Sequence, residues 1–368
     1  RDELVKLIKY VDQVYLDHGA PDRVYAPSDN AVHEMERKAT LAELEFIPAK
    51  IRHLGTGHSK LVLQNMRQTL VDHGVEIKTL EPVTEILVQD GKALGVVTTK
   101  GEYRGKYVVL APGREGASWL VTQARRLKLS TVVNSVDIGV RVEAPAVVME
   151  PLTKDFYESK LVYHSRSFED RVRTFCMCPY GKVAVENNGG LITVNGHSHS
   201  EHKTNNTNFA ILVSKNFTEP FKEPITYGQH IARLANLLGG GVLVQRLGDL
   251  LAGRRSTHSR IEKGLVVPTL PTATPGDLSL VLPYRYLVSI LEMLEAMDKL
   301  APGLYSRHTL LYGVEVKFYS SRIQVDDNFQ TDIQNLYAIG DGAGVTRGLM
   351  QASISGVLLG RAIANGET

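Results

Sequence analysis

One stretch near the C-terminus, residues 335–356, limits the possible folds of this chain more than any other. A short apolar run, 336–339, has the pattern of a buried strand, and a turn follows at once with Gly340, Asp341, Gly342 and Gly344. From Thr346 onward, apolar residues recur at helical spacing. The stretch therefore predicts a strand, a glycine-rich turn and a helix, with the helix N-terminus turned toward an anionic ligand at the strand's carboxyl end. The alternative is an ordinary strand-turn-helix that binds no phosphate.

The same stretch carries a resemblance to a known group of proteins. LYAIGDGAG and the small residues after it resemble the C-terminal FAD-binding motif of flavoproteins with two dinucleotide-binding domains. The chain more closely resembles the bacterial family of uncharacterised FAD-dependent dehydrogenases. That match covers most of the 368 residues and rests on three further stretches: GVEVKFYSSRIQ (313–324), TFCMCPYG (174–181) and VVLAPGREGASWL (108–120).

The resemblance implies FAD as the cofactor and a set of residues that bind it. Asp341 would hold the ribityl chain, and residues 347–352 would lie against the pyrimidine edge of the flavin, where the helix dipole stabilises negative charge on the reduced ring. The strand 107–110 would return the chain to the cofactor, and Gly113 would allow a close backbone approach, although a loop that merely needs glycine is the alternative. The expected cofactor-binding residues are Ala111, Gly113, Gly340, Asp341, Gly342, Arg347, Gly348, Leu349, Met350, Gln351 and Ala352.

The pyrophosphate-binding motif of this superfamily is not found in the sequence. That motif is a strand, a GxGxxG turn and an acidic residue about 20 positions later. GTGHSK (55–60) has Lys60 in the third glycine position and no apolar strand before it, and LLGGGVLV follows a helix. The resemblance therefore implies that the ADP half of the FAD site lies upstream of Arg1.

The order of elements predicts an α/β protein. A partial, three-layered, Rossmann-like FAD-binding domain is expected to carry an inserted, mainly antiparallel α+β substrate domain. The boundaries expected are 1–132 for the first part of the FAD-binding domain, 133–312 for the inserted domain and 313–368 for the return. Helices are expected at 1–20, 55–74 and 287–300, a strand at 75–80, a hairpin at 84–98 and an irregular connection at 20–49.

The strand 314–323 carries the candidate catalytic residues. Alternation places Glu315, Lys317 and Tyr319 on one face. The resemblance implies that this stretch lies near the flavin, where Lys317 beside the ring or Tyr319 as a proton donor would tune flavin reduction. The alternative is a solvent-facing edge strand on which Glu and Lys form a pair.

Two other groups of residues invite a metal or redox interpretation. Cys176 and Cys178 span too little for a relaxed disulfide and have no third cysteine, so alternating positions on a strand are favoured, although one thiol facing the flavin stays open. His197, His199 and His202 lie in a polar, turn-like segment, which favours a solvated or substrate-facing loop. No metal site is expected.

Charge and composition narrow the class of protein. Forty-two basic and forty acidic residues give a net charge of +2, which offers no argument for nucleic acid or a membrane surface. No apolar run is long enough to span a bilayer, and two cysteines are too few for a disulfide scaffold, so a cytoplasmic protein is expected. A basic cluster either receives an anionic substrate or is a solvated surface; it consists of Arg254, Arg255, His258 and Arg260.

These observations lead to three hypotheses of function. The first is an FAD-dependent oxidoreductase that transfers a hydride between the flavin and a small organic substrate. The second is a non-catalytic flavin-binding or scaffold protein. The third, an RNA-modifying flavoprotein, is disfavoured by the balanced charge.

Overall fold

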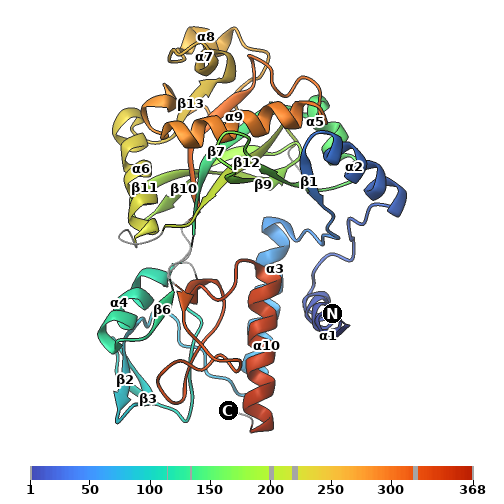
Figure 1. The fold of residues 1–368 in the computed structure, drawn as a ribbon. Helices are drawn as coiled ribbons and strands as arrows, with labels where there is room; N and C mark the ends of the chain where they lie inside the picture. Colours follow the sequence, from blue (N-terminus) through green and yellow to red (C-terminus); the bar gives the residue numbers. More distant parts are fainter. Residues whose placement is uncertain are drawn as a thin grey trace. The chain divides into compact units, whose positions relative to one another are not determined.

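The fold is given by a computed structural model, which describes residues 2–113, 115–132, 135–198, 203–217, 223–317 and 322–366. The chain forms two compact units, each assembled from separate segments (Figure 1). The first unit comprises 1–20, 57–134 and 319–368, and the second comprises 21–56 and 135–318. An α/β fold with a large, mainly antiparallel inserted domain is thereby confirmed.

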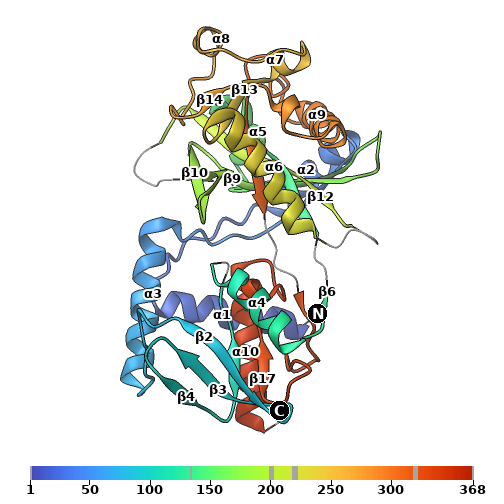
Figure 2. The same ribbon diagram turned by 90° about the vertical axis from the view of Figure 1, so that its left-hand side faces the viewer.

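The first unit contains one parallel pair of strands and a small antiparallel meander. Its helices are α1 (Asp2–Asp17), most of α3 (Gly55–Asp72), α4 (Ala117–Leu127), η2 (Asp341–Ala343) and α10 (Leu349–Asn365). Its strands are β2 (Val83–Gln89), β3 (Lys92–Thr98), β4 (Glu102–Arg104), β5 (Val108–Leu110), β6 (Thr131–Val132), β16 (Arg322–Ile323) and β17 (Leu336–Ala338). Strand β17 pairs in parallel with β5, and β2, β3 and β4 form an antiparallel meander (Figure 2).

Several predicted elements of the first unit are confirmed. The β2–β3 hairpin turns at Asp90 and Gly91, whose positive φ angles of 49° and 73° suit a two-residue turn that matches the strand twist. Helix α1 buries Leu7 and Val11 against Ile354 of α10. The strand expected at 75–80 is wrong: this segment has no regular structure. Its β-forming residues have no neighbouring strand among the described residues, and backbone pairing is what stabilises a strand.

The second unit is built around one large sheet. Its helices are α2 (Asp29–Leu41), α5 (Ala146–Thr153), α6 (Pro224–Gly239), α7 (Leu247–Leu251), α8 (His258–Glu262), η1 (Leu278–Leu280) and α9 (Tyr284–Asp298). Its strands are β1 (Leu44–Ile47), β7 (Val136–Pro145), β8 (Lys160–His164), β9 (Arg171–Cys178), β10 (Lys182–Asn188), β11 (Leu191–His197), β12 (Asn206–Lys215), β13 (Leu243–Arg246), β14 (Thr274–Pro275) and β15 (Leu310–Lys317). The eight-stranded sheet has the order β1-β8-β9-β12-β7-β15-β13-β14, and β13–β14 is its parallel pair.

The two faces of this sheet differ in chemistry. Even-numbered residues of β7, such as Ile138 and Val142, belong to an apolar core to which α2, α5 and α9 contribute; α9 lies across β7, β12 and β9 (Figure 1). Odd-numbered residues of the same strand, including Arg141 and Glu143, are equally buried on the opposite face. The β10–β11 hairpin packs on that face, where Gly196 leaves room for the Arg141 guanidinium. The sheet therefore buries an apolar core on one side, and on the other side it buries charged groups beside a smaller apolar cluster.

The structure differs from the expected boundaries at two places. The connection expected at 20–49 contains α2 and β1, and β1 joins the large sheet by pairing with β8, so residues 21–56 lie in the second unit. The prolines that suggested irregular structure lie outside both elements, and Ser28 caps α2 by accepting a hydrogen bond from the Ala31 N–H. Strand β15, expected in the returning part of the cofactor domain, also belongs to the large sheet.

None of the helices in the described ranges is both long and apolar enough to cross a membrane.

Candidate cofactor turn and buried ionic face

Two strand-turn-helix units lie next to each other in the first unit. Strand β5 leads through residues 111–116 into α4, and β17 leads through residues 339–348 into α10. The strands are parallel neighbours, so both turns leave the same edge of the sheet. The carboxyl edge of parallel strands is where α/β folds bind ligands.

The two turns touch backbone to backbone. A Cβ atom added to Gly342 would lie 2.0 Å from the carbonyl oxygen of Gly113, so only glycine fits at position 342. Gly113 and Gly340 have φ angles of 65° and 75°, in the region that favours glycine. The structure thus brings together two glycine motifs that the sequence separates widely.

Asp341 joins this turn to the start of α10. Its Oδ1 accepts hydrogen bonds from Thr346 Oγ1 at 2.6 Å and from the Gly348 N–H at 3.0 Å. The helix begins at Leu349, later than the Thr346 expected from the sequence, because Gly348 is its extended N-cap residue. Gly348 supplies no side chain to cap the first N–H groups, which are the positive end of the helix dipole.

These features fit the flavin half of FAD. The glycines expose backbone without side chains, Asp341 supplies a carboxylate held in place by hydrogen bonds, and the N-cap residue of α10, Gly348, has no side chain. A Cβ atom added at Gly113 or Gly348 would have no atom within 4 Å, so there is open space beside both glycines. All of the expected cofactor residues lie in these two turns or at the start of α10: Ala111, Gly113, Gly340, Asp341, Gly342, Arg347, Gly348, Leu349, Met350, Gln351 and Ala352. Their contacts with a cofactor stay a prediction.

The second unit contains the other candidate region, which we call the ionic face: Arg141, Glu315, Lys317, Cys176, Cys178 and Asn208. Arg141 is its centre and is fully buried. Its Nη1 lies 3.2 Å from Glu315 Oε2, its Nε donates to Asn208 Oδ1 at 2.9 Å, and its Nη2 donates to the Cys176 carbonyl at 2.6 Å. Burial alone would lower the pKa of Arg141, but Glu315 and the two neighbouring cysteines together outweigh burial and raise that pKa. The guanidinium is therefore charged and held in one orientation.

Lys317 extends this ion pair along β15. Its Nζ lies 3.1 Å from Glu315 Oε1 and 3.5 Å from Glu186 Oε2. Glu315 and Lys317 share one face, as alternation predicted, but the solvent-facing edge strand is wrong, because β15 lies between β13 and β7 and Glu315 is fully buried. Tyr319 lies outside the described residues. A catalytic role for Lys317 stays a prediction.

A hydrogen-bonded chain of Tyr157, Ser198 and His53 was not predicted from the sequence. The Tyr157 hydroxyl lies 2.8 Å from Ser198 Oγ, which lies 3.3 Å from His53 Nε2. The rings of Tyr25 and His53 pack against Tyr157, with centroids 4.7 and 4.5 Å away. Burial raises the pKa of Tyr157 to about 12 and lowers the pKa of His53. No spacing links these residues in the sequence, so only the fold brings them together.

The structure describes both cysteines, Cys176 and Cys178, but only one residue of the histidine group, His197. Both cysteines are free and lie on β9, but a bulge interrupts the simple alternation that was expected there. His197 is exposed, whereas His199 and His202 lie outside the described residues. Among the residues that the structure describes, no group of three His, Cys, Asp or Glu side chains is placed to hold a metal ion.

The basic cluster surrounds a buried carboxylate. Arg246 Nε and Arg254 Nε each donate to Asp249 at 2.9 Å, Ser256 Oγ donates to it at 2.8 Å, and Arg260 Nη1 lies 3.9 Å away. These contacts favour a structural role over an anionic-substrate site for Arg254 and Arg260.

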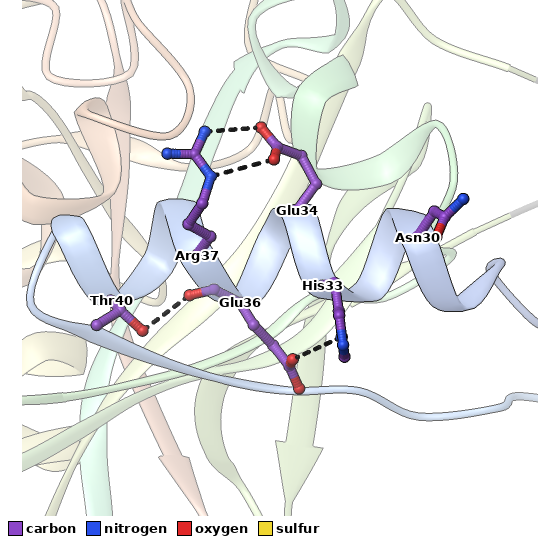
Figure 3. A pocket seen from close by; sticks show the side chains of 6 residues that line it. All are labelled: Asn30, His33, Glu34, Glu36, Arg37 and Thr40. Atoms are coloured by element: carbon purple, nitrogen blue, oxygen red, sulfur yellow. Dashed lines mark hydrogen bonds and ion pairs between the residues drawn. The ribbon is translucent and has the colours of Figure 1, made fainter.

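An open hollow of about 640 Å³ lies along α2 (Figure 3). All of its lining residues come from that one helix: Asn30, His33, Glu34, Glu36, Arg37 and Thr40. Its charged side chains pair with each other, Arg37 with Glu34 at 3.1 Å and His33 with Glu36 at 3.4 Å. The hollow is a solvated helix surface with no buried polar group, so we do not take it as a functional site.

Comparison with known proteins identifies the family. Residues 135–318 match the family model described as "FAD-dependent protein, C-terminal domain-like". A protein of Clostridium beijerinckii, itself described only as uncharacterized, is 27% identical over 340 residues. The alignment covers 84% of this chain and 62% of that protein, so this chain spans less than two thirds of the relative's length.

Solved structures give weaker likenesses. L-proline dehydrogenase from P. horikoshii is 10% identical, with a TM-score of 0.46 over 99% of this chain and 79% of that chain. Glycine oxidase from Geobacillus kaustophilus is 10% identical, with a TM-score of 0.37 over 100% of this chain and 78% of that chain. The family match stands without them, since it covers half of the residues: the chain belongs to the FAD-dependent protein family defined by this C-terminal domain-like model.

Proposed function

We propose that this chain acts in an FAD-dependent oxidoreductase that transfers a hydride between the flavin and a small organic substrate. The observation that carries the proposal is the contact between the Gly113 and Gly342 turns, with Asp341 fixed beside the start of α10. Membership of an FAD-dependent family supports it.

The residues of the cofactor turn have distinct roles in this proposal. Asp341 would hold the ribityl chain by accepting a hydrogen bond from one of its hydroxyls, and the first N–H groups of α10 would donate to the pyrimidine edge of the flavin. Gly113 and Gly342 keep side chains away from the cofactor. The bound flavin supplies the hydride chemistry, and the chain orients it and stabilises negative charge on its reduced form.

We further propose that the ADP half of FAD is held by residues upstream of Arg1. The resemblance to flavoproteins supports this. Lys317 is the proposed residue for tuning flavin reduction, with Tyr319 as a candidate proton donor. The substrate is a small molecule, and neither nucleic acid nor a membrane is proposed as a partner.

Visible absorption spectra of two natively purified proteins test the cofactor assignment: this chain and a form extended upstream. We expect flavin bands in the extended form, and their loss when D341N removes the charge of Asp341. D90N is the matched control, because Asn tolerates the positive φ of the β2–β3 turn and keeps the first unit folded. Equal flavin content in D341N and D90N contradicts the role of Asp341.

Anaerobic reduction of the bound flavin tests the reaction. We expect organic hydride donors to bleach the flavin band, and K317M to slow that reduction without releasing the cofactor. A flavin that neither NAD(P)H nor any fraction of small metabolites reduces contradicts the oxidoreductase and favours a non-catalytic flavin-binding protein.

A further inference from the structure

Thr346 lies in the turn before α10, although the sequence placed it at the start of the helix. Strand β17 ends at Ala338, and α10 begins at Leu349 after its extended N-cap residue, Gly348. Thr346 therefore belongs to the same turn as Asp341, and it is half-buried there. It was not among the residues that the sequence predicted at the cofactor.

Thr346 is held in this turn by its backbone and by its side chain. Its N–H donates to the Gly340 carbonyl at 3.4 Å, and the N–H of Val345 donates to the same carbonyl at 3.2 Å. Its hydroxyl donates to Asp341 Oδ1 at 2.6 Å, a distance typical of a hydroxyl bonded to a carboxylate. Because threonine is branched at Cβ, its χ1 rotamer is restricted, so the hydroxyl stays directed at Asp341.

The carboxylate of Asp341 gains a fixed orientation from this contact. The χ2 torsion of an Asp side chain is broad, so the plane of its carboxylate turns easily unless hydrogen bonds hold it. The Gly348 N–H donates to Oδ1 from the start of α10, whereas Thr346 donates to the same oxygen from the turn. Donors from two places fix Oδ1, and fixing one oxygen of a planar carboxylate restricts where the other oxygen lies.

We propose that Thr346 is a positioning residue for the cofactor: its hydroxyl holds the Asp341 carboxylate in the orientation that accepts a hydroxyl of the ribityl chain. This inference rests on the proposed function, in which Asp341 holds that chain. Thr346 acts through Asp341 and makes no contact of its own with FAD. A carboxylate that is already oriented in the free protein loses less freedom on binding, so Thr346 raises the affinity for FAD.

Titration of the form extended upstream with FAD, followed by flavin fluorescence, tests this role. T346V replaces the hydroxyl by a methyl group of similar size. We expect it to weaken FAD binding about tenfold, the order of effect of a hydrogen bond to a charged group. T346S keeps the hydroxyl and should recover most of the affinity. T346A removes the hydroxyl a second way, in case valine does not fit the turn.

Thr84 provides the matched control. Its hydroxyl donates to the Val97 carbonyl at 3.2 Å in the β2–β3 hairpin of the same unit, on an exposed surface. Valine suits a strand, so T84V should fold and bind FAD as tightly as the unsubstituted form. Thermal unfolding followed by circular dichroism checks that T346V, T346A and T84V are folded.

A double-mutant cycle separates positioning from a purely structural role. D341A removes the carboxylate to which the Thr346 hydroxyl donates. If Thr346 acts through that carboxylate, adding T346V to D341A weakens FAD binding no further, and the two effects are not additive. If T346V only loosens the turn, it weakens binding by the same factor with and without the carboxylate.

The outcomes that overturn the inference differ from those that overturn the proposed function. The positioning role alone is overturned if T346V and T346A bind FAD as tightly as the unsubstituted form. It is also overturned if T346V has the same effect in the D341A background. If the unsubstituted extended form takes up no FAD, the proposed function fails, and the role of Thr346 fails with it.

Discussion

At the scale of single residues, Arg141 explains how a sheet can bury charge on one face. A guanidinium removed from water is costly unless its donors are all matched, and breaking such a pair leaves an uncompensated charge. Arg141 bonds to Glu315, Asn208 and the Cys176 carbonyl, and Glu315 also contacts Lys317. Glu315 therefore supplies the negative charge that compensates two buried cations, Arg141 and Lys317.

Replacing Glu315 by Gln tests that dependence. E315Q keeps the shape of the side chain but leaves Arg141 and Lys317 without their shared negative charge, so we expect the second unit to lose about 3–5 kcal/mol of unfolding free energy. Urea unfolding followed by far-ultraviolet circular dichroism measures the loss. E34Q is the matched control, because Glu34 pairs with Arg37 on an exposed helix surface, and we expect no measurable change there. Similar midpoints for E315Q and E34Q would refute the argument.

The residue scale also shows how far sequence reasoning reaches. That Glu315 and Lys317 share a face was predictable, because side chains alternate along any strand. The burial of Glu315 and Lys317 could not be predicted, because it depends on the strand order of the sheet and on Arg141, which lies 174 positions from Glu315 in the chain. The chain of Tyr157, Ser198 and His53 escaped prediction for the same reason, as its members meet only through tertiary structure.

Among the helices, strands and turns, those with conformational preferences set by nearby residues were the ones that the sequence predicted. The β2–β3 hairpin and the turn before α10 carry glycines and acidic residues whose conformational preferences act within a few positions. The strand expected at 75–80 failed because a strand needs a partner that its own residues do not supply. Helix α2 was missed because prolines on both sides suggested a loop, although its Ser28 cap was a readable signal.

Asp249, which lies in α7, gives a prediction for pH dependence. Burial alone would raise the pKa of Asp249, but hydrogen bonds from Arg246, Ser256 and Arg254 outweigh it and lower that pKa to about 2. The folded-state pKa lies below the unfolded value of about 3.9, so the stabilisation is complete above about pH 5 and is lost progressively as the pH falls toward about 2.

Urea midpoints of the unsubstituted chain and of D249N, measured over this range, check the prediction. Because Asn carries no charge for the arginines at any pH, we expect D249N to be less stable near neutral pH. The difference between the two urea midpoints should narrow as the pH falls below about 5. A gap that stays constant from pH 7 to pH 2 would show that the carboxylate charge of Asp249 contributes no stability.

At the scale of the whole molecule, each unit has its own apolar core. Leu336 of β17 is fully buried in the core of the first unit, and Leu294 of α9 is fully buried in the core of the second. The chain also carries a natural reporter for each unit. Its single tryptophan, Trp119, lies on α4 of the first unit, and its two cysteines lie on β9 of the second. Separate cores predict separate unfolding transitions.

Reciprocal core substitutions test that independence. We expect L336A to lower the urea midpoint of Trp119 fluorescence and to leave thiol exposure at Cys178 unchanged. We expect L294A to lower the urea midpoint of thiol exposure at Cys178 and to leave the midpoint of Trp119 fluorescence unchanged. Each substitution should lower the unfolding free energy of its own unit by about 2–5 kcal/mol. Thiol exposure is read by pulsed alkylation in C176S, so that only the buried Cys178 responds. Trp119 donates to the Thr84 carbonyl within the first unit, so its fluorescence follows that unit's own unfolding. If either substitution moves both midpoints equally, the units unfold as one cooperative body, and losing the charge of Glu315 would then also weaken the cofactor turn.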